Sequence, residues 1–415
     1  MIRILTFSTL FPNAAQPAHG IFVERRLQHL LATGEVTSSV VAPVPWFPSG
    51  ARIFGRYSEV ARAPLQETRL GVRVLHPKYP VIPKLGMNFA PRLLARAAWP
   101  AVERLRREGQ GFDLIDAHYY FPDGVAATMI GRRLGVPVVI TARGNDVNLI
   151  PNWRRPRLMV RQASDAAAAT ITVCQALKDR LVSLGCDARK IVVLRNGVDA
   201  VVFSPQDQTL ARAETGLDAQ RRWLLSVGHL IPRKGHDLTI RALRELPEFG
   251  LAIVGDGELR HELESLSVRS GVRERVRFLG RVPPDRLPAF YSVAEASVLA
   301  SSSEGLANVL LESLACGTPV VATPVDGTPE VITGLPAGVL VGERSAAGVR
   351  DAVRQLFEHY PDRRAVRAFG QSLGWDATSR GQLELFARIL GRSEVAAPGA
   401  ADAGDGTATA RVATR

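Results

Sequence analysis

The sequence feature that most restricts the fold is an alternation of short apolar segments with longer amphipathic ones along almost all of the 415 residues. Short apolar segments are typical of buried strands, and apolar residues spaced three or four apart are typical of helices that bury one face. Parallel strands need crossover connections that usually contain a helix. The order of elements therefore predicts an α/β fold built on parallel sheets.

The expected strands form two series, at residues 2–7, 39–42, 114–116, 137–141, 169–173 and 191–194, and then at 223–227, 251–254, 276–279, 296–299 and 319–322. The expected helices lie between them, at residues 22–31, 91–107, 124–133, 175–184, 236–246, 258–269, 285–291 and 309–315, with a helical stretch from 346 to about 390. The Pro- and Gly-rich segment 44–88 breaks the pattern and predicts a long loop.

Two series of this kind predict two Rossmann-like domains that face each other across a cleft, where a ligand would be enclosed. The linker is expected near residues 203–211, which gives an N-terminal domain at 1–203 and a C-terminal domain at 204–375. The terminal stretch 393–415 is small, polar and aperiodic, so we expect it to be disordered.

The net charge of +12 is confined to the first half of the chain. Residues 1–200 hold 27 Lys and Arg against 14 Asp and Glu. Two expected helical stretches carry many of these cations, namely Arg92, Arg96, Arg104, Arg106 and Arg107, and Arg154, Arg155, Arg157 and Arg161. An anionic membrane surface or an anionic acceptor fits this pattern, and an ordinary solvated surface stays open. Nucleic acid is disfavoured because no binding module or aromatic platform accompanies the charge.

Three scattered cysteines, Cys174, Cys186 and Cys316, match neither a disulfide framework nor a metal site. They favour a reducing compartment. No run approaches the roughly 18 apolar residues of a membrane-spanning helix. We therefore expect a cytoplasmic protein, with peripheral association at the cytoplasmic membrane face as a hypothesis.

The segment EGLANVLLESLACGTPVVAT, residues 304–323, carries the strongest functional signal. Glu304 precedes a short apolar helix, and Glu312 lies inside it. The helix N-terminus at Leu306, Ala307 and Asn308 has free backbone N–H groups and favours an anion such as phosphate. A carboxylate beside phosphate is repulsive, so the two glutamates are better suited to accept hydrogen bonds from hydroxyls. Phosphate together with a polyol indicates a sugar nucleotide, although two surface glutamates on a solvated helix are the plain alternative.

Two further positions stand at expected strand or helix ends. His118 follows a strand at the carboxyl edge, where open α/β sheets bind ligands. A buried structural histidine is the alternative. Gly20 lies directly before a helix, where its missing side chain lets a phosphate or sugar approach the backbone.

The pattern of Glu304, seven residues, Glu312 and a GTPVV turn closely resembles the signature of the retaining glycosyltransferase family 4. The resemblance extends over residues 1–390 through the strings HGIFVERR, FDLIDAHYYFPDG, ITARGNDV, VLRNGVD, VGHLIPRKG and VGDG. HGIFVERR is most similar to the branch that makes exopolysaccharides and cell-wall polymers. The resemblance implies the GT-B fold, with a donor-binding C-terminal domain, an acceptor-binding N-terminal domain and a last helix, 376–392, that crosses back to the first domain.

The resemblance also implies roles for the donor side. Glu304 would contact the donor sugar near the reacting carbon, and Glu312 would accept from the ribose hydroxyls. Lys234 would bind the diphosphate, whereas His229 stands where the family has an arginine, so either His229 or Arg233 supplies the second contact. The remaining donor contacts would come from Gly20, from the helix N-terminus at Leu306, Ala307 and Asn308, and from the backbone between Gly280 and Val282, which would face the base.

On the acceptor side, His118 would act beside Glu304 as the second catalytic residue. Arg143 stands where many members have histidine. Asp146 would orient the acceptor, with a local turn cap as the equal alternative. Segment 44–88 would be an acceptor-side loop.

The implied reaction moves a hexosyl group, with retention, from a nucleoside-diphosphate sugar to a glycan or polyprenyl-linked acceptor in polysaccharide biosynthesis. No Asp-x-Asp motif is present, so neither a metal nor a cofactor is expected. Two alternatives stay open: a sugar-nucleotide epimerase on the same fold, and a non-catalytic scaffold that binds membrane polymer through its basic face.

Overall fold

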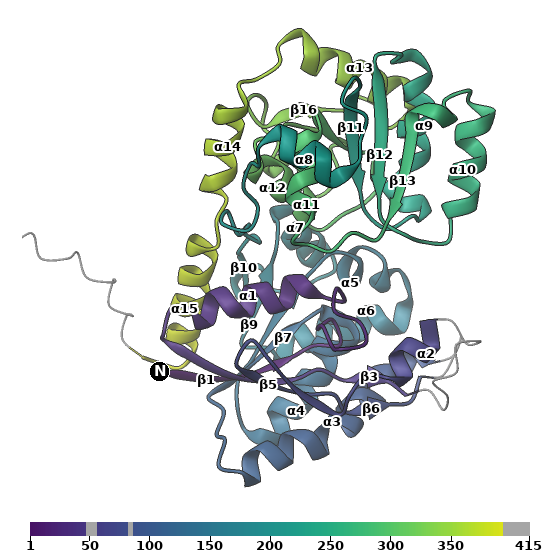
Figure 1. The fold of residues 1–415 in the computed structure, drawn as a ribbon. Helices are drawn as coiled ribbons and strands as arrows, with labels where there is room; N and C mark the ends of the chain where they lie inside the picture. Colours follow the sequence, from purple (N-terminus) through teal and green to yellow (C-terminus); the bar gives the residue numbers. More distant parts are fainter. Residues whose placement is uncertain (47–55, 82–85, 393–415) are drawn as a thin grey trace, which may run out of the picture.

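The computed structural model describes residues 1–46, 56–81 and 86–392. Its two large sheets, each with helices on both sides, are stacked one above the other (Figure 1). The expected α/β class and the two Rossmann-like units are confirmed. The disordered tail expected at 393–415 lies outside the described residues.

The first sheet has eight strands in the order β10-β9-β8-β7-β1-β2-β5-β4. Its strands are β1 (Ile2–Phe7), β2 (Val36–Val41), β4 (Gln66–Arg69), β5 (Val72–Leu75), β7 (Leu114–His118), β8 (Val138–Ala142), β9 (Ala169–Thr172) and β10 (Ile191–Val193). Its helices are α1 (Ile21–Leu31), α2 (Arg56–Ala61), α3 (Ala90–Arg107), α4 (Val125–Leu134), α5 (Asn145–Asn148), α6 (Arg154–Ala166) and α7 (Gln175–Ser183).

The prediction of a loop throughout 44–88 was wrong. β5 pairs with β2 in parallel, and β4 pairs with β5 in antiparallel orientation, so this edge of the sheet is not parallel. The short strands β3 (Val44–Pro45) and β6 (Lys78–Tyr79) form a separate parallel pair. β4 has no buried residue and is hydrophilic, which removes the apolar signal by which a strand is recognised.

The second sheet has six strands in the order β13-β12-β11-β14-β15-β16. Its strands are β11 (Arg222–Val227), β12 (Phe249–Val254), β13 (Val276–Gly280), β14 (Ala296–Leu299), β15 (Val320–Ala322) and β16 (Gly338–Leu340). The helices of this half are α8 (Gln208–Thr215), α9 (His236–Ala242), α10 (Arg260–Arg269), α11 (Leu287–Val293) and α12 (Asn308–Ala315), followed by α13 (Ala346–Glu358), α14 (Arg363–Ser372) and α15 (Asp376–Ile389). α8 begins inside the expected linker, and β16 was not predicted.

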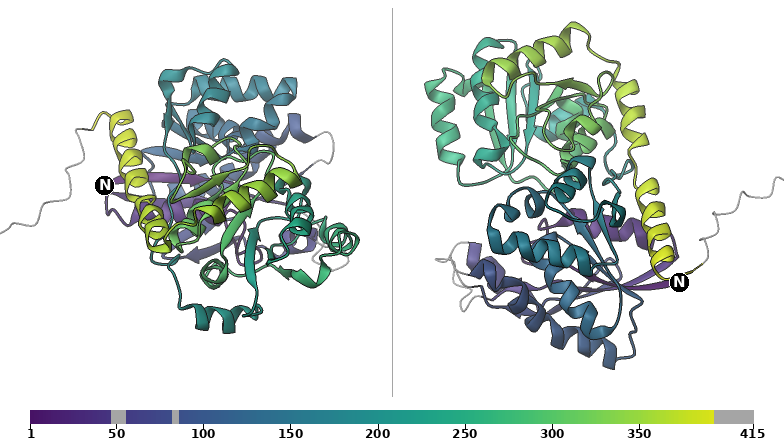
Figure 2. Two further views of the ribbon diagram at one scale, coloured as in Figure 1. Left: turned by 90° about the horizontal axis from the view of Figure 1, so that it is seen from above. Right: turned by 180° about the vertical axis from the view of Figure 1, so that it is seen from behind.

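The chain returns to the first unit at its end. α14 and α15 run along the side of the molecule, and α15 lies beside α1 near the N-terminus (Figures 1 and 2). Trp375 stacks on His29 of α1 with a centroid distance of 5.4 Å. Gln382 is buried and donates to Asp116 of β7 at 2.8 Å. The C-terminal helix therefore joins the two units as a second connection beside the covalent linker, and Arg367 of α14 donates to the Ala200 carbonyl at 2.7 Å.

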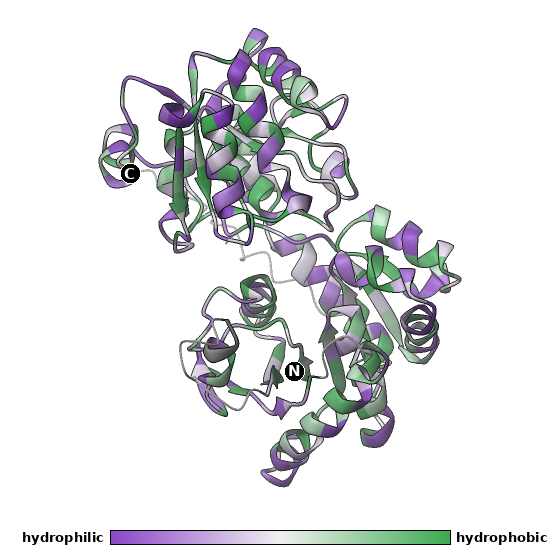
Figure 3. Cartoon of the chain, turned by 90° about the vertical axis from the view of Figure 1, so that its right-hand side faces the viewer, coloured by the Kyte–Doolittle hydropathy of each residue, from purple (hydrophilic) through white to green (hydrophobic). Residues whose placement is uncertain are grey.

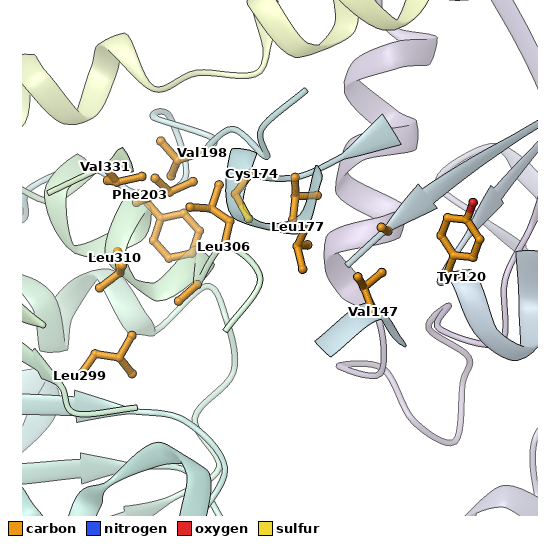
Figure 4. Packing of buried hydrophobic residues seen from close by; sticks show 14 of the residues in the cluster. Tyr120, Val147, Cys174, Leu177, Val198, Phe203, Leu299, Leu306, Leu310 and Val331 are labelled. Carbon is orange, nitrogen blue, oxygen red and sulfur yellow. The ribbon is translucent and has the colours of Figure 1, made fainter. Parts of the chain in front are cut away.

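Hydrophobic residues concentrate in the strands and on the helix faces turned toward them (Figure 3). One buried cluster continues from the first unit into the second. Cys174 and Leu177 of the α7 region lie next to Leu306 and Val198 at the boundary (Figure 4). The two units therefore share apolar packing as well as polar contacts in this structure. Among the described residues, no helix is long and apolar enough to cross a membrane.

Candidate active site

Glu304 lies in the loop between β14 and α12, and its carboxylate is enclosed by cations and a hydroxyl. Its Oε1 accepts hydrogen bonds from Lys234 Nζ and Ser301 Oγ, both at 2.6 Å. Its Oε2 lies 3.1 Å from a guanidinium nitrogen of Arg233. Burial raises the pKa of this carboxyl, but the two cations and the hydrogen bonds outweigh burial, so the pKa of Glu304 is lowered. The side chain is therefore a carboxylate at neutral pH.

The loop that carries Glu304 is held by Asp326, which follows β15. Asp326 Oδ2 accepts from the backbone N–H of Glu304 at 2.6 Å and from Ser303 Oγ at 3.0 Å. Asp326 itself has a φ of 45°, in the left-handed region that favours glycine. Backbone conformations of this kind are concentrated at functional sites. Asp326 thus positions Glu304 without pairing with its carboxylate.

His229 and Arg233 differ in the charge that they bring to this loop. Arg233 reaches the same carboxylate as Lys234. Burial lowers the pKa of His229, and the nearby Lys234 and Arg281 lower it further, so the imidazole is neutral at pH 7. Arg233 is therefore the second cation beside Glu304, and His229 offers only hydrogen bonding. His236 supports the turn by contacting the His229 carbonyl through Nε2 at 3.2 Å.

The N-terminus of α12 lies directly after Glu304. Leu306 and Ala307 are buried, and Asn308 is the first helical residue. Within the described part of the chain, no acceptor takes the backbone N–H groups of Leu306, Ala307 or Asn308. Gly317 ends the helix with a φ of 74°, as the sequence predicts for a left-handed cap. The free N–H groups and the adjacent cations form one anion-attracting edge.

Glu312 lies inside α12 and is also buried, but its surroundings differ from those of Glu304. Tyr291 donates its hydroxyl to Oε2 at 3.1 Å. Arg25 of α1 reaches across from the first unit to Oε1 at 3.4 Å. Burial raises the pKa of Glu312, while Arg25 and the Tyr291 hydroxyl oppose that rise. Two donors leave lone pairs of this carboxylate free for further hydrogen bonds.

A buried hydrogen-bonded chain connects His118 with the start of α12. His118 Nε2 lies 3.3 Å from Asp116 Oδ2, and His118 Nδ1 lies 2.7 Å from an Arg143 guanidinium nitrogen. Arg143 then donates to Asn196 Oδ1 at 2.8 Å, and Asn196 donates to Asn308 Oδ1 at 3.0 Å. Burial lowers the pKa of His118, so its ring is neutral at pH 7. His118 and Arg143 are thus joined to each other and, through Asn196, to α12 of the second unit.

Asp146 has the geometry of the turn cap. Its oxygens accept from the backbone N–H groups of Arg143 at 3.1 Å, Gly144 at 2.7 Å and Tyr120 at 2.6 Å. The side chain has an exposed fraction of 0%. A carboxylate held in this way has no free face toward an acceptor, so the direct orienting role expected for Asp146 does not fit its position.

The local backbone requires glycine at position 20. Gly20 precedes α1 with a φ of 68°, and a Cβ there would lie 2.3 Å from the carbonyl carbon of Leu10. The backbone that approaches Gly20 closely is therefore that of Leu10, in the loop before α1. Whether a donor also contacts Gly20 stays a prediction.

Gly280 is the last residue of β13, and Val282 lies two residues after it. Gly280 has a φ of 68°, and its carbonyl accepts from Gly255 N–H at 2.8 Å. Val282 is half-buried against the core. Their contact with a base stays a prediction.

The two units touch through bare backbone next to Glu304. A Cβ on Gly305 would lie 2.0 Å from the Arg143 carbonyl oxygen, and one on Gly144 would lie 2.9 Å from the Gly305 nitrogen. Asn148 of α5 donates to the Glu304 carbonyl at 3.2 Å. Glycine at both positions therefore permits the domain contact.

Sequence reasoning missed Arg25, Asn148, Tyr291 and Ser301, and it assigned Asp326 no role. Arg25 and Asn148 act from distant segments, whereas Tyr291 lies 21 residues before Glu312 and Ser301 lies three residues before Glu304. No local sequence pattern marks any of these pairings. Among the described residues, no group of three His, Cys, Asp or Glu side chains is placed to hold a metal ion.

Comparison with known proteins agrees with this geometry. The family described as Glycosyl transferases group 1 matches residues 207–372, and Glycosyltransferase Family 4 matches residues 58–201. A D-inositol 3-phosphate glycosyltransferase of Frankia alni is 32% identical over 311 residues, which cover 69% of this chain and 76% of the relative. A Bacillus subtilis protein named as a candidate teichuronic acid biosynthesis glycosyltransferase, TuaC, is 27% identical over 86% of this chain and 90% of the relative.

Two solved structures share the fold. Sucrose-phosphate synthase from Thermosynechococcus elongatus has a TM-score of 0.77 at 20% identity and covers 94% of this chain and 100% of its own. Anabaena HepE in complex with UDP-glucose has a TM-score of 0.67 at 18% identity, over 94% of this chain and 99% of its own. The protein is therefore a glycosyltransferase of the two-domain GT-B class. Within that class, the chain belongs to glycosyltransferase family 4.

Proposed function

We propose that this glycosyltransferase transfers a hexosyl group from a nucleoside-diphosphate sugar to a glycan or polyprenyl-linked acceptor, with retention at the anomeric carbon. The observation that carries the proposal is the centre at Glu304, where Lys234, Arg233 and the free N-terminus of α12 converge. Two cations and a helix N-terminus suit a diphosphate, and the buried carboxylates suit sugar and ribose hydroxyls.

The donor class has independent support from a neighbour of the same fold. HepE was solved with UDP-glucose bound. We propose that the diphosphate lies against Lys234, Arg233 and the N–H groups of Leu306, Ala307 and Asn308, with the ribose diol at Glu312. The diphosphate would then take over cations that now pair with Glu304. No metal or cofactor is required in this proposal, because the protein's own cations offset the leaving charge.

The proposed step is a front-side displacement. The bond between the anomeric carbon and the β-phosphate oxygen breaks, and the acceptor oxygen forms its bond to that carbon on the same face. The acceptor proton passes to the departing phosphate oxygen. His118, neutral and buried, would hold a hydroxyl near the reacting carbon, and Glu304 would orient the donor sugar. A double displacement is less well supported, since the cations hold Glu304 tightly.

We propose that the acceptor is an intermediate in the synthesis of a polysaccharide or a related polymer. The name of the Bacillus subtilis relative places that protein in teichuronic acid biosynthesis. A lipid-linked acceptor would require the enzyme to work at the cytoplasmic face of a membrane, and the excess of cations in the first half supports an anionic surface there.

The test is release of nucleoside diphosphate from a panel of UDP-, GDP- and ADP-sugars, with and without membrane extract. We expect release from one donor, enhanced by the extract and lost in Lys234→Ala. Conversion of the sugar nucleotide without release would indicate the epimerase instead. Absence of any turnover across the panel would contradict the proposed donor class.

A further inference from the structure

The segment between the active site and α6 presents an unusual outer surface. Asp146 lies in α5, and the chain then passes through η4 (Ile150–Asn152) into α6. We define the α6 face as the outward side chains of this segment, namely Leu149, Trp153, Arg154, Arg155, Arg157, Leu158 and Arg161. All seven are exposed.

The cations of the α6 face stand where the helix itself disfavours them. Arg154, Arg155 and Arg157 occupy the first turn of α6, which contains no acidic residue. A helix N-terminus carries partial positive charge, so three guanidinium groups there repel it. Within the described residues, no carboxylate pairs with Arg154, Arg155 or Arg161. Such an arrangement is stabilised by an external anion.

Large apolar side chains lie among these cations. Trp153 is 52% exposed, Leu158 is 54% exposed and Leu149 is 42% exposed. Arg154, Arg155, Arg157, Leu158 and Arg161 together line an open hollow of about 450 Å³. Tryptophan and leucine beside arginine match the boundary between lipid headgroups and acyl chains, where aromatic rings and basic groups are both favoured.

The α6 face has a fixed orientation because the opposite side of the helix is anchored. Pro156, Val160, Ala163 and Ser164 of α6 are buried. The 3-10 helix η2 (Gly86–Asn88) packs against α6, and the following residue, Phe89, is 51% exposed. A rigid helix can therefore present charge and apolar surface together, without first becoming ordered.

The α6 face also adjoins the candidate active site. Asn148, immediately before Leu149, donates to the Glu304 carbonyl and to Ser303 Oγ, each at 3.2 Å. α5 and α6 lie on one side of the first unit below the second unit (Figure 1). A bilayer against the α6 face would thus lie beside the segment that contacts the Glu304 loop, where a lipid-linked acceptor is needed.

We propose that the α6 face is the surface through which this protein docks on a bilayer with anionic headgroups. The inference rests on the proposed function at a membrane, and it names the surface and the lipid charge. Nucleic acid is a poorer occupant, since it would leave Trp153, Leu149 and Leu158 without apolar contact.

The test measures co-sedimentation of the full chain with two kinds of vesicle at low salt. One contains phosphatidylcholine alone, and the other also contains roughly 30 to 40 mol% phosphatidylglycerol. We expect binding only to the anionic vesicles. Because each basic residue near such a surface contributes about fivefold, Arg154→Glu/Arg155→Glu should weaken binding at least about tenfold. Trp153→Ser should weaken binding to anionic vesicles at high salt more than at low salt, because apolar insertion is not screened.

The matched control is Arg106→Glu/Arg107→Glu on α3, which changes the charge equally at two exposed positions. This control should lose less than about twofold. Equal loss in both variants, no binding of the wild type to anionic vesicles, or tighter binding to a single-stranded RNA oligonucleotide would each overturn the proposal. Donor turnover in detergent-free buffer is measured in parallel. Turnover without vesicle binding would refute only the docking surface, whereas vesicle binding without turnover would refute only the enzymatic proposal.

Discussion

Lys234 and Arg233 bind the same carboxylate, and this pairing defines the resting state of the site. Both cations lie in η6 (Pro232–Lys234), a single turn before α9. A buried carboxylate with no cation would be protonated or would destabilise the fold. We propose that Glu304 keeps the two cations in place until a diphosphate competes for them.

Replacement of Lys234 by alanine should lower kcat/KM by about 100- to 1000-fold, because one charge-assisted contact to the leaving diphosphate is lost. Steady-state release of nucleoside diphosphate measures the effect. Arg241→Ala on the exposed side of α9 is the control and should be near wild type. Equal activity of Lys234→Ala and Arg241→Ala would remove Lys234 from the donor site.

His236, which supports the loop with Lys234, makes the stability of the fold depend on pH. The ring is buried, and its Nδ1 forms a hydrogen bond with Ser226 Oγ at 2.9 Å. Burial lowers its pKa from 6.5 to about 4. The unfolded chain therefore binds this proton first as pH falls, so the stability that neutral His236 contributes is complete above pH 6.5 and is lost progressively toward pH 4.

We expect the free energy of unfolding to fall between pH 7 and pH 5, and His236→Gln should reduce that fall by up to about 1.4 kcal/mol per pH unit. Urea titrations at several pH values provide the measurement. The variant and the wild type are compared over the same pH range, because other buried histidines contribute to both. Parallel curves for the two proteins would exclude His236 as a source of the slope.

At the scale of elements, α1 and α12 are coupled by the ion pair of Arg25 and Glu312. Arg25 also lies over the Phe203 ring at 5.1 Å, and Phe203 contacts Tyr291 edge to face at 6.4 Å. Tyr291 is the other donor to Glu312. One helix of the first unit, the linker and two helices of the second unit thus meet at the carboxylate proposed to bind ribose.

Arg25→Gln should raise KM for the donor about tenfold or more with a smaller change in kcat, because Glu312 would lose the cation that opposes its raised pKa. The increase should be larger at pH 6 than at pH 8, since a protonated Glu312 no longer accepts from both ribose hydroxyls. Arg25→Lys should restore most of the affinity. A donor KM that is unchanged in Arg25→Gln at both pH values would contradict this coupling.

The sequence allowed prediction of elements with clear ends and apolar interiors. β1 and α12 were predicted within a residue, since both have apolar inner faces and Gly317 marks the end of α12. β4 and β16 were missed because each is short and has little buried apolar surface. Glu304 and Glu312 were singled out by their spacing around a short helix, and Lys234 by the resemblance to family 4. Their partners Arg25 and Asp326 were not, because these contacts join segments far apart in the chain.

At the scale of the whole molecule, α15 stabilises the first unit, although it follows the second unit in the chain. Gln382 accepts from Arg26 Nε at 2.8 Å and donates to Asp116 Oδ2 at 2.8 Å. Asp116 contacts His118, so the last helix reaches the candidate site through a single side chain. The two units are therefore connected by the linker, by α15 and by the contacts at Glu304.

Gln382→Ala should destabilise the folded state by about 3 kcal/mol, since it leaves the buried charges of Arg26 and Asp116 without their shared partner. Urea unfolding followed by fluorescence measures the change. Gln371→Ala, on an exposed position of α14, should change stability by less than about 0.5 kcal/mol. A small effect of Gln382→Ala would mean that water replaces this side chain at no cost.

The most direct test of the account is the anomeric configuration of the first product. The protein is incubated with the α-linked nucleotide sugar that it consumes, and the sugar released or transferred is followed by proton NMR before mutarotation. We expect an α product, formed by wild type and not by Lys234→Ala. A β product would contradict retention and would require the acceptor or water to attack from the opposite face of the sugar.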